Sequence, residues 1–233
     1  PTAQDGIAPF DTQVVETVKT VVSTDIDSEK LFSSLSSNTR RKVRKASREG
    51  YTVNNSVKHL EHEFYPIYST NLHRLGTPVF SAAMFEQMSK NLGDHLAFYA
   101  IEHDNTFVGG MVCLKARNEW TSLYVAIEDD AQKKYAGYLL YWTALEDAAR
   151  NGASRFNLGR STVGSGAHRY KLQWAGEDIM AVHNFLGQDA DKAANRLKSA
   201  TGKEGLKTKV WKKLPEPVAN LAGQYLRKPL PFV

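Results

Sequence analysis

Three strand-like segments joined by very short turns constrain this chain more than any other feature. Residues 95–102 (HLAFYAIE), 106–116 (TFVGGMVCLKA) and 119–127 (EWTSLYVAI) are rich in β-branched and aromatic residues. The turn signals HDNT and RN between them are too short for a crossover connection. The three segments are therefore predicted to form an antiparallel meander from His95 to Ile127.

The segments around this meander predict a mixed α+β fold. Residues 136–151 have apolar side chains at helical spacing, and RFNLG after them is typical of a buried strand. Further elements are expected as follows: helices over 27–50, 59–75, 81–92, 167–176 and 189–200, and strands over 14–22, 51–56 and 179–187. This order resembles that of the GNAT acyltransferase fold, in which neighbouring strands part, here after residue 120.

The composition indicates a globular protein with a modest basic excess. Hydrophobic residues make up 42% of the 233 positions, and the net charge of +5 favours phosphate-bearing partners such as nucleotides, RNA or anionic lipid. Cys113 is the single cysteine, so no disulfide forms within the chain, and a core position is expected for it. No apolar run reaches the ~20 residues of a membrane span. With no signal peptide visible, a cytoplasmic location is expected.

The stretch FNLGRSTVGSGAHRYKLQWAG, residues 156–176, is the strongest candidate for a catalytic site. The backbone N–H groups of Gly164, Ser165 and Gly166 could form a nest for an anion, with a cation close by. Lys171 is the predicted group that polarises a donor carbonyl, and His168 or Tyr170 could take a proton from an amine. The alternative is a mobile surface loop with Lys171 in solvent.

The same stretch supplies candidate substrate-binding residues. Arg160 and Ser161 leave a strand at its carboxyl end, where open α/β sheets usually place ligands. His168 and Lys171 are three positions apart and should share a helix face, whereas Tyr170 is expected to point towards the core beside Trp174.

Two other motifs bear on donors and partners. QKKYAG (132–137) matches the turn that cradles the pyrophosphate of CoA, but Tyr135 stands where the first glycine belongs, which opposes CoA binding. The run from Arg40 to Arg48 is either a solvated helix face or a phosphate contact, and no aromatic residue is interleaved to stack on bases.

Two further patterns favour structural explanations. His59, His62 and Glu63 lack the order of a known metal motif, so no metal site is predicted. The tail VWKKLPEPVANLAGQYLRKPLP favours a helix docked on the domain over one lying on a membrane surface, although a weak membrane contact stays open.

Taken together, these pieces resemble the FemAB-like peptidyl and aminoacyl transferases, a group with the GNAT fold, and most of all its branch associated with exopolysaccharide and PEP-CTERM loci. The resemblance covers residues 31–230. It rests on TRRKVRKASREGYTV, HRLGTPVFS, the 156–176 stretch and VWKKLPEPVANLAGQYL. Asn157-Leu158-Gly159 replaces the family's Asp-Phe-Gly, and Tyr170-Lys171 replaces its Phe-Lys.

The resemblance implies a domain organisation and an activity. Residues 31–233 would form a GNAT-like acyltransferase domain with a helical tail, and residues 1–30 an extension that is the remnant of a preceding unit. The implied reaction moves an acyl or aminoacyl group onto an amine of an envelope or polysaccharide precursor. The donor would be aminoacyl-tRNA, with no cofactor, and Arg74 and Tyr124 are candidate substrate-binding residues. A non-catalytic module that binds an anionic partner, and an acyl-CoA-dependent N-acetyltransferase, are the alternatives.

Overall fold

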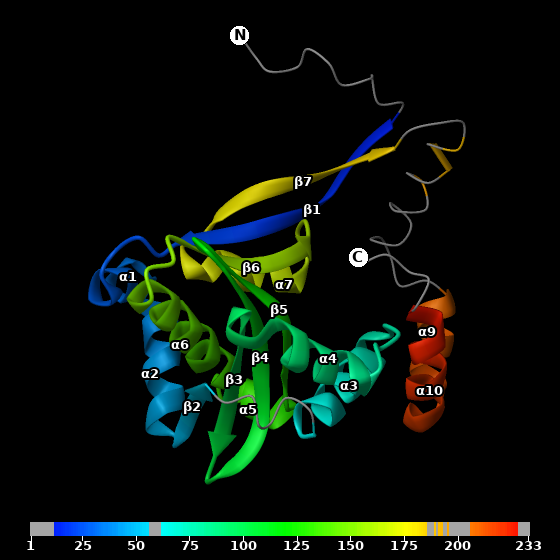
Figure 1. Cartoon of the computed structure of the whole chain (residues 1–233), viewed down its shortest axis with the longest axis horizontal. Coiled ribbons are helices and arrows are strands. Elements are labelled where there is room, and N and C mark those ends of the chain that lie inside the picture. The colour runs from blue at the N-terminus through cyan, green and yellow to red at the C-terminus, as the bar shows by residue number, and fades with distance from the viewer. Residues whose placement is uncertain are drawn as a thin grey trace.

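The framework of the molecule is a seven-stranded sheet (Figure 1). The computed structural model describes residues 12–55, 62–185, 189, 191–192, 195 and 206–227. The strands are β1 (Thr12–Ser23), β2 (Tyr51–Asn55), β3 (Leu96–His103), β4 (Thr106–Ala116), β5 (Glu119–Ile127), β6 (Arg155–Thr162) and β7 (Glu177–Phe185). They lie in the order β2-β3-β4-β5-β6-β1-β7, and β5 and β6 run parallel whereas the other neighbours run antiparallel.

The predicted meander forms the centre of this sheet. Strands β3, β4 and β5 pair in sequence order, and all three are antiparallel to their neighbours within the meander. The turn between β3 and β4 places Asp104 (φ 50°) and Asn105 (φ 60°) in the left-handed region, as a two-residue type I′ hairpin requires. The mixed α/β fold predicted from the sequence is confirmed.

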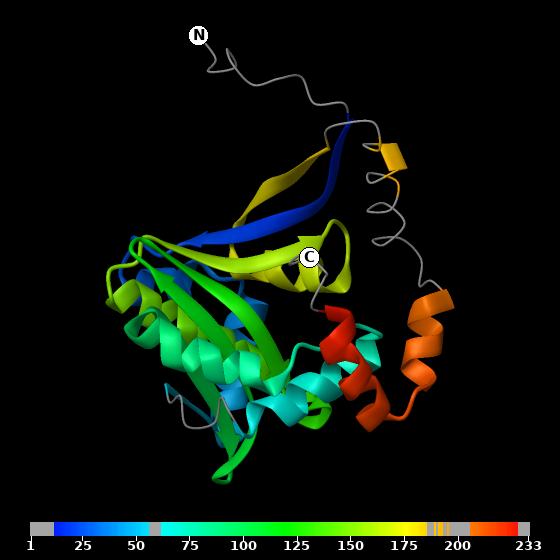
Figure 2. The ribbon, with the colours of Figure 1, turned by 45° about the vertical axis from the view of Figure 1, so that its right-hand side comes forward.

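Helices cover both faces of the sheet (Figures 1 and 2). On one face lie α1 (Ser28–Ser34), α2 (Ser37–Arg48) and α6 (Ala136–Arg150); on the other lie α3 (Phe64–Leu75) and α4 (Ala82–Leu92). Each face of the sheet has its own hydrophobic core: the first core lies under α1, α2 and α6, and the second lies under α3 and α4. Because successive strand residues point to opposite faces, Tyr99 and Ile101 of β3 enter the first core while Phe98 and Ala100 enter the second. The remaining elements are η2 (Gly93–His95), α5 (Asp129–Lys133), α7 (Gly166–Lys171), η3 (Leu172–Trp174), α9 (Leu206–Lys213) and α10 (Glu216–Arg227).

Some predicted helices differ from the observed ones. The single helix expected over 27–50 is two helices, because Leu35 is extended and the Ser36 hydroxyl caps α2 by accepting the Thr39 N–H at 3.1 Å. The helix expected from His59 begins at Phe64, and residues 56–61 lie outside the described part of the chain. Most of the helix expected over 189–200 also lies outside it.

The two ends of the described chain are built into the domain. The strand expected over 14–22 is β1, which lies inside the sheet between β6 and β7. The division of the chain at residue 30 stays a prediction. The docked tail is confirmed, because α9 and α10 both contact α3, and the Thr70 hydroxyl donates to Glu216 Oε1 at 2.6 Å. Over the described residues, no helix combines the length and apolar character of a membrane span.

Candidate functional site

The parallel strands β5 and β6 part soon after they begin to pair. They are in register only from Glu119 opposite Arg155 to Thr121 opposite Asn157. Just beyond, β5 carries an extra residue in its pairing with β4, and β6 carries one in its pairing with β1. Such bulges bend a strand and increase its local twist. The splay predicted after residue 120 is confirmed. Beyond it, β5 stays paired with β4 and β6 with β1, but the backbone groups of β5 and β6 that face each other have no strand partner.

Gly159 lies in the bulge of β6, at the start of the splay. Its φ of +81° is strained for any residue with a Cβ atom, and an added Cβ would lie 2.9 Å from the Ser122 carbonyl oxygen. The Asn157 side chain holds this bend by accepting the Gly159 N–H at 2.9 Å. Sequence reasoning compared Gly159 with a family motif but did not name it as a site residue, because nothing local reveals a positive φ inside a strand.

Lys171, the last residue of α7, reaches the backbone of β6 at this bend. Its Nζ donates to the carbonyl oxygens of Gly159 and Arg160, both at 2.9 Å, and the residue is 8% exposed. No carboxylate of the described residues pairs with it. Burial lowers the pKa of Lys171 to about 8, because the charged form loses water without gaining an opposite charge. The alternative in which Lys171 extends into solvent is wrong.

Tyr170 points away from Lys171 into an aromatic cluster, as its place in α7 predicted. Its ring lies 5.0 Å from Tyr138, 5.4 Å from Tyr141 and 6.2 Å from Trp174, measured between ring centroids. The Tyr170 hydroxyl is buried and makes no hydrogen bond of normal geometry within the described residues. Burial raises the pKa of Tyr170 well above its ordinary value, so the hydroxyl stays protonated at neutral pH.

His168 uses both ring nitrogens within the protein. Its Nε2 lies 2.6 Å from Asp178 Oδ2, and its Nδ1 accepts the Gly164 N–H at 3.0 Å. A nitrogen that accepts a hydrogen bond carries no proton, so Nε2 carries it and donates to Asp178. The Thr20 hydroxyl donates to the other Asp178 oxygen at 2.8 Å. This arrangement joins α7 to β7 and β1 and favours a positioning role for His168, while its role in proton transfer stays a prediction.

The loop before α7 is tied down by its own hydrogen bonds. The Gly164 N–H is used by His168, and the Ser165 N–H donates to the Thr162 carbonyl at 3.1 Å. Two of the three N–H groups proposed for an anion nest are therefore occupied, and the nest does not form as predicted. The roles of Gly164 and Gly166 in substrate binding stay predictions. Ser161 is 7% exposed, and its hydroxyl has no partner within the described residues.

The other candidate residues are spread over the domain. Arg160 is an exposed residue of β6 whose carbonyl holds Lys171. Tyr124 of β5 belongs to the core under α3 and α4, and its ring contacts Tyr68 at 5.7 Å. Arg74 is the penultimate residue of α3 and pairs with Asp129 Oδ1 at 3.0 Å, largely in solvent. The structure therefore brings Lys171 against the backbone of Arg160, the neighbour of Ser161, with His168 on the same helix as Lys171, whereas the Tyr124 ring contacts α3 and Arg74 pairs with α5.

The turn before α6 is the segment QKKYAG, in which Tyr135 replaces the first glycine of the CoA-binding motif. Tyr135 takes φ +69°, the left-handed conformation in which a glycine would be expected and which a residue with a Cβ atom rarely adopts. Its ring packs against Tyr138, with 5.9 Å between ring centroids. The Gln132 side chain lies over Gly137, where an added Cβ would meet Gln132 Oε1 at 2.7 Å. These side chains surround the positive end of α6, which in a CoA-binding turn faces phosphate.

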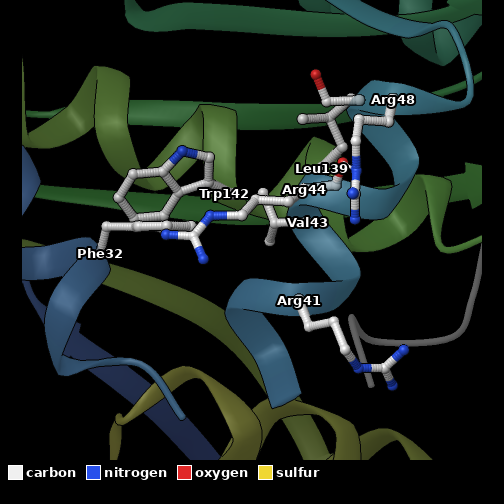
Figure 3. A pocket seen from close by; sticks show the side chains of 8 residues that line it. Phe32, Arg41, Val43, Arg44, Arg48, Leu139 and Trp142 are labelled. Carbon is white, nitrogen blue, oxygen red and sulfur yellow. Dashed lines mark hydrogen bonds between the residues drawn. The ribbon is translucent and has the colours of Figure 1, made fainter. Parts of the chain in front are cut away.

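The six cations of α2 divide into two sets. Three do not line the groove described next: Arg40 donates to the Leu35 carbonyl, Lys42 donates to the Tyr138 hydroxyl, and Lys45 forms an i,i+4 ion pair. The other three line a groove of about 650 Å³ whose floor is apolar (Figure 3). They are Arg41, Arg44 and Arg48, and the apolar side chains include Phe32, Leu139 and Trp142. Aromatic residues from α1 and α6 thus accompany the basic run, although none is interleaved in its sequence.

Two remaining features of the sequence are the single cysteine and the possible metal-binding residues. Cys113 is fully buried in the first core, and burial raises the pKa of its thiol, as a core residue requires. Among the residues that the structure describes, no three His, Cys, Asp or Glu side chains form a group suited to a metal ion. His59 lies outside the described residues.

Comparison with known proteins identifies the fold. A family model described as an acetyltransferase (GNAT) domain matches residues 33–172, more than half of the chain. The crystal structure of FemX superposes with a TM-score of 0.65 at 13% sequence identity, over 78% of this chain and 63% of FemX. L-PGS from Bacillus licheniformis superposes with a TM-score of 0.58 at 12% identity, over 83% of this chain and 68% of L-PGS. No curated protein sequence matches the chain. The structural similarities show a shared fold, and the chain spans 63% of the length of FemX.

Proposed function

The chain belongs to the family of acetyltransferase (GNAT) domains, and we propose that it moves an acyl or aminoacyl group onto an amine. The observation that carries the proposal is the buried Lys171 ammonium at the splay between β5 and β6. It is held by two carbonyl oxygens and no carboxylate of the described residues. An ammonium has three N–H donors, so one remains for a ligand. In a site of low dielectric such a donor is worth far more than in water.

The chemistry follows from where charge develops. The acceptor amine attacks the carbonyl carbon of the donor, a C–N bond forms, and the carbonyl oxygen takes on negative charge. Lys171 would donate its remaining N–H to this oxygen. The bond from the carbonyl carbon to the leaving oxygen or sulfur then breaks, and the proton that the amine loses ends on that leaving atom, which departs as an alcohol or a thiol. We assign His168 and Asp178 to holding α7, and thus Lys171, in place.

We propose that the donor is an aminoacyl ester, as on charged tRNA, and that CoA is not the preferred carrier. The support comes from the turn before α6, where the Gln132 side chain lies against Gly137 and the Tyr135 ring packs on Tyr138 in the first turn of the helix. These groups occupy the approach that a pyrophosphate would use. The resemblance to FemAB-like transferases points the same way.

For the acceptor we propose an amine of a cell-envelope or polysaccharide precursor, modified in the cytoplasm. The resemblance to the exopolysaccharide branch of the FemAB-like group supports this choice. The name of another structural neighbour, a putative lysylphosphatidylglycerol synthetase, is consistent with transfer of an aminoacyl group to an envelope component.

The test is a search for new amides. The protein is incubated with cell extract and either a charged tRNA pool or acyl-CoA, and products are analysed by mass spectrometry. We expect an amide with the tRNA donor that is absent with the Lys171→Ala variant. Amide formation with acyl-CoA alone, together with CoA binding in calorimetry, would establish the alternative of an acyl-CoA-dependent N-acetyltransferase, which the description of the family favours.

A second candidate function is a binding module without catalysis. Arg41, Arg44 and Arg48 favour it, because they line one groove and have no carboxylate partner among the described residues. Such a module would bind an anionic polymer tightly and in a salt-sensitive way, and would give no amide with any donor.

A further inference from the structure

Helix α10 packs on the domain through its small residues and turns its large apolar residues outward. Ala219 is 1% exposed, and an added Cβ on Gly223 would lie 2.9 Å from the Val79 backbone nitrogen. The exposed residues are Val218 (51%), Leu221 (62%), Tyr225 (66%) and Leu226 (52%). A helix on the surface of a globular protein normally has the opposite arrangement.

The exposed side chains form one continuous strip. Positions 218, 221, 225 and 226 follow the i, i+3, i+7, i+8 pattern, which places them on a single helix face. Single exposed apolar side chains are common on protein surfaces, whereas a contiguous apolar strip marks a site of association.

The neighbouring helix α9 adds positive charge. It carries four lysines and no acidic residue. Lys213 lies three positions after Val210 and shares its helix face, and Lys209 lies four positions before Lys213; Val210 is itself 54% exposed. The carboxylate of Glu216, at the start of α10, is taken up by the Thr70 hydroxyl of α3. Only residues 214 and 215 separate the two helices, and the exposed residues Lys209, Val210, Lys213, Val218, Leu221 and Leu226, here called the α9–α10 surface, supply both apolar and cationic groups.

We propose that the α9–α10 surface docks this protein on a lipid bilayer that contains anionic phospholipids. An amphipathic helix in the membrane interface buries its apolar face at the boundary of head groups and acyl chains, while lysines contact the head groups. A second copy of the chain fits less well, because a two-fold contact would bring the lysines of both α9 helices together. This docking goes beyond the proposed acyl transfer and does not depend on it. Figure 2 shows α9 and α10 together at one end of the molecule, beside α3.

The first test removes apolar contacts. The full chain is sedimented with vesicles of phosphatidylcholine containing phosphatidylglycerol, and with vesicles of phosphatidylcholine alone. We expect binding to the anionic vesicles, weakened about tenfold or more by the double change Leu221→Ser and Leu226→Ser. The matched control changes Ile26→Ser and Val182→Ser, which are similarly exposed but lie away from this surface. The control should bind as the wild type does.

The second test removes charge. Lys209→Gln with Lys213→Gln should weaken binding to anionic vesicles roughly twentyfold, since each basic residue near such a surface strengthens binding about fivefold. Lys30→Gln with Lys133→Gln removes equal charge elsewhere and should have little effect. Because the altered side chains are exposed, melting temperatures should stay close to the wild-type value.

Three results would overturn the proposal. The first is recovery of the wild type only in the supernatant after sedimentation with anionic vesicles. The second is binding of the Leu221→Ser, Leu226→Ser variant as tight as that of the wild type. The third is a dimer in sedimentation equilibrium without lipid that this variant abolishes, which would assign the surface to a second copy. None of these results bears on amide formation, so the proposed transferase activity would stand or fall separately.

Discussion

Two basic residues that the sequence marked as candidate site residues, Lys171 and Arg74, differ in burial and in the charge of their partners. Lys171, at the splay of β5 and β6, is buried against two backbone carbonyls. Arg74, at the end of α3, lies largely in solvent and pairs with Asp129. A cation paired with a carboxylate in water has little field left for a ligand, whereas a buried cation without a counter-charge retains it. The comparison therefore favours the splay as the reactive region.

The largest expected effect comes from removing the buried cation. Lys171→Ala should lower the rate of amide formation about 10²–10³-fold, the usual cost of losing one preorganised donor to a developing oxyanion. Lys171→Arg should restore only part of the rate, because the planar guanidinium is wider than an ammonium. Circular dichroism checks that both variants fold. A wild-type rate for Lys171→Ala would remove the distinction between the two regions.

The second prediction concerns pH. If Lys171 acts as a cation, turnover should fall about tenfold per unit above the pKa of about 8. In Lys171→Arg the slower rate should stay level over the same range, because a guanidinium does not lose its proton there. A rate that rises through pH 8 would instead assign the neutral amine to the role of base.

The same depressed pKa has a consequence for stability, with a defined sign. Between pH 8 and the ordinary value of 10.5 the unfolded chain binds the Lys171 proton and the folded chain does not. The stability of the wild type relative to Lys171→Met should therefore rise with pH across this window. Urea denaturation at several pH values measures the difference, and a decrease with pH would contradict the assigned burial.

The fourth prediction addresses the backbone that shapes the splay. Gly159→Ala should lower the free energy of unfolding by about 1–3 kcal/mol, because the added Cβ meets the Ser122 carbonyl oxygen and φ stays positive. Gly152→Ala is a matched control, since Gly152 has a similar φ of +75° and open space around it. Thermal unfolding of the two variants separates the contact from the conformational strain. Equal losses would show that strain alone accounts for the effect.

The smallest effect is expected at the exposed end. Arg74→Ala should cost about 0.3–1 kcal/mol of stability, the usual contribution of a cation at the end of a helix and of an exposed ion pair. The role of Arg74 in substrate binding stays a prediction, and substrate titrations of this variant test it. A raised KM with unchanged kcat would show that the exposed region also contacts substrate.

The sequence predicted the elements whose signals are local. The meander follows from alternating residues and short turns, and α6 from apolar spacing that ends near Gly152. The place of Tyr170 beside Trp174 followed from helical spacing in the same way. These patterns need no knowledge of distant residues.

The features that escaped prediction depend on contacts between distant segments. Nothing near Lys171 in the sequence shows that β6 will bend at Gly159 and offer two carbonyl oxygens. Likewise Asp178 meets His168 only because β7 pairs with β1, which in turn pairs with β6. The anion nest at Gly164 was plausible from composition, but the His168 ring took the hydrogen bond that a ligand would have needed.

The position of β1 between β6 and β7 has a consequence for how the domain folds during synthesis. Thr24, just after β1, bonds to Ala153, just before β6, across 129 positions of sequence. Pairs so distant form slowly, because a long loop must close before any contact compensates for it. At typical synthesis rates β1 would wait on the order of ten seconds before β6 and β7 exist. During that time a valine-rich strand has exposed edges, so the first strand made is among the last to be placed and is the segment most in need of protection from aggregation.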